Sequence, residues 1–193
     1  MSLIEVMIGL VIMGILLALG LPSMATWLNN SQIRTAGETM LAGLTLARVE
    51  AVRRNQIVRF QLVSDLSSGC AILQSGTSWV VSLDDPTGQC DQAPSDTAAP
   101  RIIQSRSGGE GTPRAVVAAA TAGTVYFNGL GRVTSPGGAL NMTQLSISNP
   151  TGGTCEHVDG GNMRCLRIDI SLGGEARMCD PAVTDATDPR KCT

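Results

Sequence analysis

The stretch that decides the fold is residues 1–28, MSLIEVMIGLVIMGILLALGLPSMATWL. Glu5 is its one charged side chain, and no further charged side chain follows before Arg34. About 20 consecutive apolar residues are enough for a helix to cross the hydrocarbon core of a bilayer, and the run from Val6 to Leu28 has that length. We therefore expect a helix that lies in lipid or among other apolar helices, with an unexplained acid at its edge.

A secretory signal peptide is the competing interpretation of this stretch. It would carry a basic region first, then a shorter apolar region and a cleavage site of small residues. Here no basic residue precedes Arg34, and the apolar run passes directly into further helical sequence. We expect the segment to be retained in the mature protein.

Beyond Pro22 the pattern becomes amphipathic, because apolar residues recur at steps of three and four and form a single stripe. One continuous helix over about residues 2–54 is predicted, on the order of 80 Å long at 1.5 Å per residue. Proline removes a backbone donor from a helix, so a kink is expected at Pro22. The stripe consists of Ile33, Ala36, Met40, Leu44, Ala47 and Ala51.

The rest of the chain has the pattern of a β domain. Residues 57–63 and 166–170 alternate between apolar and polar side chains, as half-buried strands do. Asn128-Gly129 is a hairpin signal. Further strands are expected at 78–83, 114–119, 123–127 and 143–148. The predicted fold class is α+β, a long helix packed on an antiparallel β-sheet domain. The expected division is 1–28 (apolar half of the helix), 29–55 (amphipathic half) and 56–193 (globular domain).

The cysteines indicate an oxidising compartment, since all six lie beyond residue 69 and an even number favours disulfides. Zinc is the alternative, but it prefers cysteine pairs about two to four residues apart, and this chain has none. Six cysteines allow fifteen pairings, and the sequence does not select one. Pairing each cysteine with its neighbour would join Cys70–Cys90, Cys155–Cys165 and Cys179–Cys192, each closing a short loop.

Catalysis is not expected. The chain has one histidine, His157, and carries neither a G-x-S-x-G elbow nor a phosphate-binding glycine loop. The adjacent acids Asp84 and Asp85 precede Pro-Thr-Gly and are typical of a solvated turn. We expect no enzyme activity, no cofactor and no metal.

The opening MSLIEVMIGLVIMGILLALGLPSM resembles the mature amino terminus of type IV pilins and pseudopilins. The resemblance implies that a prepilin peptidase cuts before Met1 and methylates its amine, and that Glu5 and Pro22 serve filament assembly. Members of the family usually begin with phenylalanine, so Met1 is a departure. Residues 41–62, LAGLTLARVEAVRRNQIVRFQL, together with YFNGLGRV and GGEARMCDP, are similar to the GspH/FimT-type minor pilins.

This resemblance implies a structural subunit, a minor pilin that helps to initiate or cap a type IV pilus. Its partners would be other pilin subunits. It would reside in the inner membrane before assembly, with a periplasmic globular domain, and in an extracellular filament afterwards. A pseudopilin of a type II secretion system is the alternative, and the sequence does not separate major from minor subunits.

Some FimT-type members take up DNA through a C-terminal G-R-x-R motif. Here the matching positions are Gly174-Glu175-Ala176-Arg177, and a glutamate repels phosphate. Nearby aspartates at 180, 185 and 188 dilute the remaining positive charge. A solvated mixed-charge surface is the favoured interpretation, and DNA binding is an alternative hypothesis. The candidate contacts would be Arg164, Arg167, Arg177, Arg190 and Lys191.

Glu5 has an explanation in the context of a filament. In a single chain, an acid in the first turn of a helix favours the helix dipole. When apolar helices bundle, the carboxylate enters a medium of low dielectric and needs a cation. The family picture suggests that this cation is the Met1 amine of a neighbouring subunit, which would set the axial register.

Overall fold

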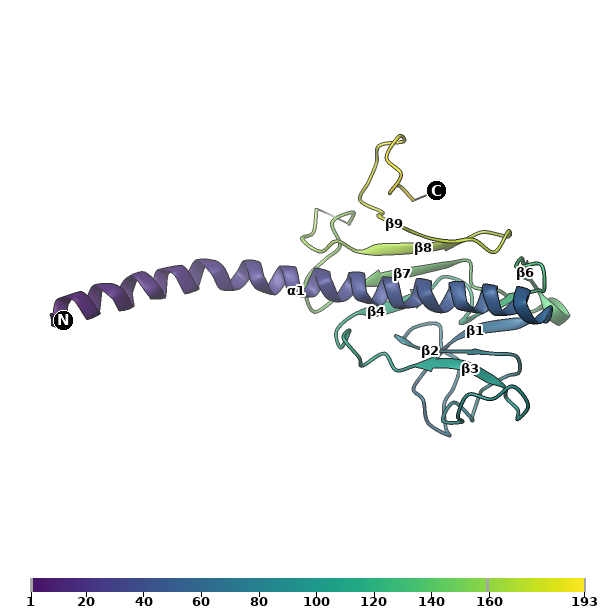
Figure 1. The fold of residues 1–193 in the computed structure, drawn as a ribbon. Coiled ribbons are helices and arrows are strands. Elements are labelled where there is room, and N and C mark those ends of the chain that lie inside the picture. The colour runs from purple at the N-terminus through teal and green to yellow at the C-terminus, as the bar shows by residue number, and fades with distance from the viewer. Residues whose placement is uncertain (1, 159, 193) are drawn as a thin grey trace.

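The computed structural model describes residues 2–158 and 160–192, with the backbone but not the side chains of residues 17–23. A long helix, α1 (Leu3–Arg54), precedes an antiparallel β domain. Its first half projects freely to the left in Figure 1, and its second half lies across the β domain. The predicted α+β class is confirmed.

Two antiparallel sheets cover α1, one on each side of the helix (Figure 1). The first sheet has the order β3-β2-β1-β5-β6, with β1 (Val58–Val63), β2 (Ser78–Ser82), β3 (Ile102–Arg106), β5 (Thr124–Phe127) and β6 (Val133–Thr134). The second has the order β4-β7-β8-β9, with β4 (Val116–Ala119), β7 (Gln144–Ser148), β8 (Leu166–Ile170) and β9 (Ala176–Cys179). A short 3-10 helix, η1 (Pro136–Gly138), follows β6.

The predicted apolar stripe forms the centre of the core. All six of its side chains are fully buried between the two sheets. They meet Phe60 and Trp79 from the first sheet and Ile147 and Ile168 from the second. A helix in this position contributes most of its stability through burial of one face rather than through intrinsic propensity. The stripe prediction is therefore confirmed residue by residue.

Two glycines in α1 let the helix approach both sheets closely. A Cβ atom on Gly43 would lie 2.7 Å from Cε2 of Phe60, on the first sheet. A Cβ atom on Gly37 would lie 2.7 Å from Sδ of Met178, on the second sheet. Real Cβ atoms avoid such distances, so a larger residue at 43 would press on the rings of Phe60 and Trp79, whereas at 37 the flexible end of the Met178 side chain would have to move aside.

The apolar half of α1 differs from two expectations. The helix runs through Pro22 as a gentle curve rather than a sharp kink (Figure 1), since long helices bend smoothly over many residues. We expected the run from Val6 to Leu28 to cross a membrane. Within the residues that the structure describes, no helix is sufficiently long and apolar to do so. The side chains of residues 17–23, near the middle of this run, lie outside the description.

The strand predictions hold for six strands and miss three of the four strands at the sheet edges. The six predicted segments correspond to β1, β2, β4, β5, β7 and β8, and the Asn128-Gly129 signal marks the β5–β6 hairpin. Strands β3, β6 and β9 were not predicted. Strands β3 and β9 pair with the previously predicted β2 and β8, so their extended form depends on a neighbour rather than on a local pattern.

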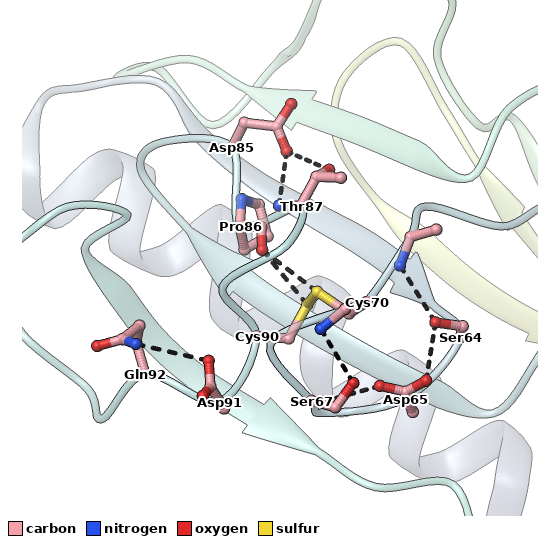
Figure 2. The surroundings of a disulfide bond; sticks show 12 residues. Ser64, Asp65, Ser67, Cys70, Asp85, Pro86, Thr87, Cys90, Asp91 and Gln92 are labelled. Atoms are coloured by element: carbon pink, nitrogen blue, oxygen red, sulfur yellow. Dashed lines mark hydrogen bonds between the residues drawn. A yellow bond between two sulfur atoms is a disulfide. The ribbon is translucent and has the colours of Figure 1, made fainter.

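The cysteines form the three bonds of the neighbour-to-neighbour pairing: Cys70–Cys90, Cys155–Cys165 and Cys179–Cys192. Figure 2 shows the first of these beneath a turn in which Asp85 accepts a hydrogen bond from the backbone N–H of Thr87 at 3.0 Å. The interpretation of the acid pair as a solvated turn is confirmed for the exposed Asp85, whereas the half-buried Asp84 forms an ion pair with Arg101 at 2.6 Å. Closing loops of this length stabilises a fold by roughly 2–3 kcal/mol each in the chain-entropy model.

Candidate functional site

The apolar half of α1 is the largest exposed apolar surface in the described part of the chain. Large side chains from Leu3 to Leu16 are exposed on every side of the helix, and Met24, Trp27 and Leu28 extend this surface to the globular domain. A soluble helix normally hides its apolar residues on one face, and a helix that is apolar all round is normally buried. Exposed patches of this kind mark interaction sites.

Glu5 lies in the first turn of α1, and its side chain is exposed. Its carboxylate accepts a hydrogen bond from the backbone N–H of Ser2 at 3.4 Å. This bond satisfies one of the free donors that every helix start leaves. Within the described residues the carboxylate has no ion-pair partner.

Met1, the predicted methylation site, and Pro22, a predicted assembly residue, are the other candidates in residues 1–28. Met1 lies outside the described residues. Pro22 lies within α1, but its side chain is not described. The roles that the resemblance assigns to them remain predictions.

Three of the candidate DNA-contact arginines pair with aspartates, and two of these aspartates lie in the C-terminal region. Arg164 Nη2 lies 3.5 Å from Oδ2 of Asp180, whose side chain is 8% exposed. Arg190 Nη2 lies 2.7 Å from Oδ2 of Asp188. The hydrogen bond from the Arg190 side chain lowers the pKa of the Asp188 carboxyl to about 2. Two of the three aspartates expected to dilute the positive charge, Asp180 and Asp188, are thus in direct contact with it.

Arg167, Arg177 and Lys191 also have partners within the chain. Arg167 donates to Asp169 at 2.9 Å. Arg177 donates to backbone carbonyls in the C-terminal tail, residues 181–192. Lys191 Nζ donates to another tail carbonyl at 3.1 Å. Arg177 thus ties the tail to β9, Arg167 pairs within β8, and Lys191 bonds within the tail itself.

A hollow between the tail and this sheet is mixed in charge. It has a volume of about 340 Å³, and its charged lining is Asp169, Glu175, Arg177 and Lys191. Two acids balance the two bases, so the hollow does not favour an anion. Asp169 also lies near the sulfur atoms of Cys179 and Cys192. Because these sulfurs form a disulfide, they are not thiolate ligands for a metal.

A second groove lies at the boundary between the two halves of α1, and the sequence did not predict it. It has a volume of about 630 Å³ and runs between α1 and the β8–β9 sheet. Trp27 forms part of its wall with a side chain that is 66% exposed. The one available signal was a tryptophan at the end of the apolar run in a chain with 3% aromatic residues. The remaining lining comes from Asn30, Ser31, Arg34, Arg164, Leu166, Met178, Cys179, Asp180 and Arg190.

Comparison with known proteins gives one family and one kind of structural neighbour. The family model for type II transport protein GspH matches residues 36–174. No curated protein matches the chain. Two crystal structures of the type IV minor pilin FimU of Pseudomonas aeruginosa (strain PAO1) are similar to it. One has 19% identity and a TM-score of 0.41, covering 75% of this chain and 90% of FimU. The other has 18% identity and a TM-score of 0.43, covering 76% and 87%.

Proposed function

Because the chain belongs to the GspH family, we propose that it is a minor pilin, a structural subunit that helps to initiate or cap a type IV pilus. Its role is to pack against other pilin subunits rather than to transform a substrate. In this proposal residues 1–28 form the filament core, residues 29–55 anchor the helix to the head, and residues 56–193 form the head itself.

The observation that carries the proposal is the exposure of the apolar half of α1. Fully burying one Leu, Ile, Val or Met side chain is worth roughly 1.5–3 kcal/mol, and more than ten such side chains are exposed between Leu3 and Leu28. The β domain does not reach this segment, which projects beyond every strand (Figure 1). A bundle of similar helices from other subunits would bury it.

In this proposal Glu5 fixes the axial register between the helices of such a bundle. Its partner in the single chain is the Ser2 N–H group, which does not neutralise a charge. Inside a bundle the carboxylate needs a cation, since an unpaired buried charge costs several kcal/mol. We propose that the Met1 amine of a neighbouring subunit supplies it, so that a shift of one axial step would leave charges unpaired.

The proposal extends to processing and location. As in the pilins that the opening sequence resembles, a prepilin peptidase would cut before Met1 and methylate the new amine. The subunit would wait at the inner membrane with its head in the periplasm, where the disulfides are stable. Assembly would then move it into the extracellular filament.

Mass spectrometry of sheared surface filaments tests this proposal. We expect peptides of this chain at a small fraction of the abundance of the main subunit, with a methylated amine at Met1. The abundance also decides between minor and major status. A chain that is absent from purified filaments while it is present in the cell envelope would contradict the proposal.

A pseudopilin of a type II secretion system is the second candidate, and the description of the matching family favours it. The two candidates differ in what a deletion abolishes. Loss of surface filaments with normal secretion supports the minor pilin. Loss of secretion with normal filaments supports the pseudopilin.

DNA uptake is not proposed as the function, because the five candidate contact residues all have partners within the chain. A shift assay with residues 29–193 checks this point. We expect no binding at moderate salt. Binding that weakens with salt and with Arg177→Ala would favour the DNA hypothesis.

A further inference from the structure

We propose that the groove between α1 and the β8–β9 sheet receives the first turn of α1 from another pilin subunit. The occupant is defined by its chemistry, an apolar helix with a single carboxylate in its first turn. This inference rests on the proposed function, because it names the contact through which neighbouring subunits would be staggered.

The lining of the groove matches such an occupant. Trp27, Leu166 and Met178 provide apolar contact area. Trp27 contributes the largest flat surface, because it is 66% exposed in the single chain. Apolar side chains such as Leu3 and Ile4 of an incoming helix would cover this surface.

The charges of the groove and of the helix are complementary. Arg34, Arg164 and Arg190 line the groove, and Asp180 is the acid among the lining residues. Glu5 is the single charged side chain in the first 33 residues of the chain. Arg164 and Arg190 already pair with aspartates. The positive charge that a Glu5 carboxylate can reach in this groove is therefore that of Arg34.

Arg34 is the arginine most available to a new partner. Its side chain is 74% exposed, and its present partner is Glu38, one turn along the same helix, at 2.8 Å. An exposed i,i+4 pair of this kind is worth only about 0.3–0.5 kcal/mol. The Glu5 carboxylate of an incoming apolar helix would compete with Glu38 for Arg34. The incoming helix would exclude water from the groove, and charge-assisted hydrogen bonds strengthen as water is excluded.

The groove is held in shape independently of its charges. The side chain of Asn30 accepts a hydrogen bond from the backbone N–H of Arg164 at 2.9 Å. Asn149 donates to the side chain of Asn29 at 3.2 Å. These bonds tie the boundary of the two helix halves to the second sheet, so that the groove exists before a partner arrives.

The site implies a specific stagger between subunits. Glu5 and Arg34 are 29 positions apart, or about 43 Å along a helix that rises 1.5 Å per residue. A neighbour whose Glu5 reaches Arg34 is displaced by that distance along the filament axis. A carboxylate has two oxygens, so contact with Arg34 is compatible with contact to a Met1 amine.

Site-specific photo-crosslinking between two copies of the full chain in detergent micelles tests the inference. A benzophenone amino acid replaces Ile4 in one copy, and a second, isotope-labelled copy provides the groove. We expect crosslinks to Trp27 or Met178, and a yield that falls about tenfold in Arg34→Glu, the effect of one charge-assisted hydrogen bond. The same label at Ile12 is the control for position, since it lies about 12 Å further along the helix.

Arg106→Glu, on the edge strand β3 of the other sheet, is the matched charge control and should leave the yield unchanged. Crosslinks confined to residues 2–16 of the second copy would overturn the inference. So would a yield that Arg34→Glu does not lower. Anionic phospholipid that co-purifies through Arg34, without any crosslink, would assign the groove to a lipid phosphate and equally overturn it. Failure here, with the chain still found in sheared filaments, leaves the proposed function intact.

Discussion

The two halves of α1 differ in how many apolar residues they carry, 20 among residues 1–28 and 11 among residues 29–55, and in where those residues lie on the helix. In the second half the apolar residues occupy one stripe, and both sheets bury it completely. In the first half they surround the helix and remain exposed. Both the amount of apolar residue and its arrangement around the helix therefore separate the buried surface that folds the domain from the exposed surface that we propose joins it to other chains.

The glycines and the glutamates of the two halves also differ in whether the rest of the chain contacts them. Gly43 lies against Phe60, whereas Gly14 has no atom of another element within 4 Å of its added Cβ. Glu50 is bound by two arginines, whereas Glu5 contacts a backbone N–H. Matched substitutions in the two halves can therefore test the comparison directly.

The largest expected difference is between Leu44→Ala and Leu10→Ala. Leu44 is fully buried, and removal of a buried leucine side chain costs about 2–5 kcal/mol of unfolding free energy. Leu10 is 66% exposed, and we expect a change within about 0.5 kcal/mol. Urea unfolding monitored by the fluorescence of the buried Trp79 measures both. Equal destabilisation by the two variants would break the comparison.

A smaller and opposite pair of effects is expected at the glycines. Gly43→Ala forces its methyl group against Phe60 and Trp79 and should cost about 1–3 kcal/mol, as overpacking does. The methyl group of Gly14→Ala would have no neighbouring atom within 4 Å, and the substitution should stabilise the helix by about 0.5–1 kcal/mol. Circular dichroism during thermal unfolding measures the first, and the helical content of the full chain in detergent measures the second. A neutral Gly43→Ala variant would mean that the helix is not tightly seated.

The charge comparison gives the smallest effect. The hydrogen bond from Arg53 is the main cause that lowers the pKa of Glu50 below its usual 4.5, and Arg54 adds to it. Glu50→Gln should therefore cost about 0.3–0.5 kcal/mol at pH 7. A carboxyl with a lowered pKa stabilises the fold above pH 4.5 and loses this contribution as the pH falls through its folded value. Denaturant unfolding should thus show a larger difference between the variant and wild type at pH 7 than at pH 3. Glu5→Gln is the control and should change neither value.

Local patterns made much of the fold predictable. The stripe from Ile33 to Ala51 was visible because helical periodicity is local, and β1 and β8 were visible because their alternation is local. Neighbouring cysteines closed short loops, so the simplest pairing was also the one formed.

The edge strands β3, β6 and β9 and the groove were not predictable from the sequence, because they depend on contacts between distant segments. Strand β3 (Ile102–Arg106) gains its form from pairing with β2. The groove joins Trp27 and Arg34 to Arg164, more than a hundred positions away, and no local pattern encodes such a juxtaposition. Partners for the arginines, such as Asp180 for Arg164, likewise appear only once the second sheet is assembled.

The central claim is that the apolar half of α1 and its acid act between chains and not within one. Incorporation of Glu5→Ala into sheared filaments, quantified by mass spectrometry against wild type, tests it most directly. Glu38→Ala, which removes an exposed acid from the other half of the helix, is the control. We predict that Glu5→Ala lowers incorporation at least tenfold while the level in the cell envelope and the unfolding of the β domain stay unchanged, and that Glu38→Ala incorporates normally. Normal incorporation of Glu5→Ala would contradict the account.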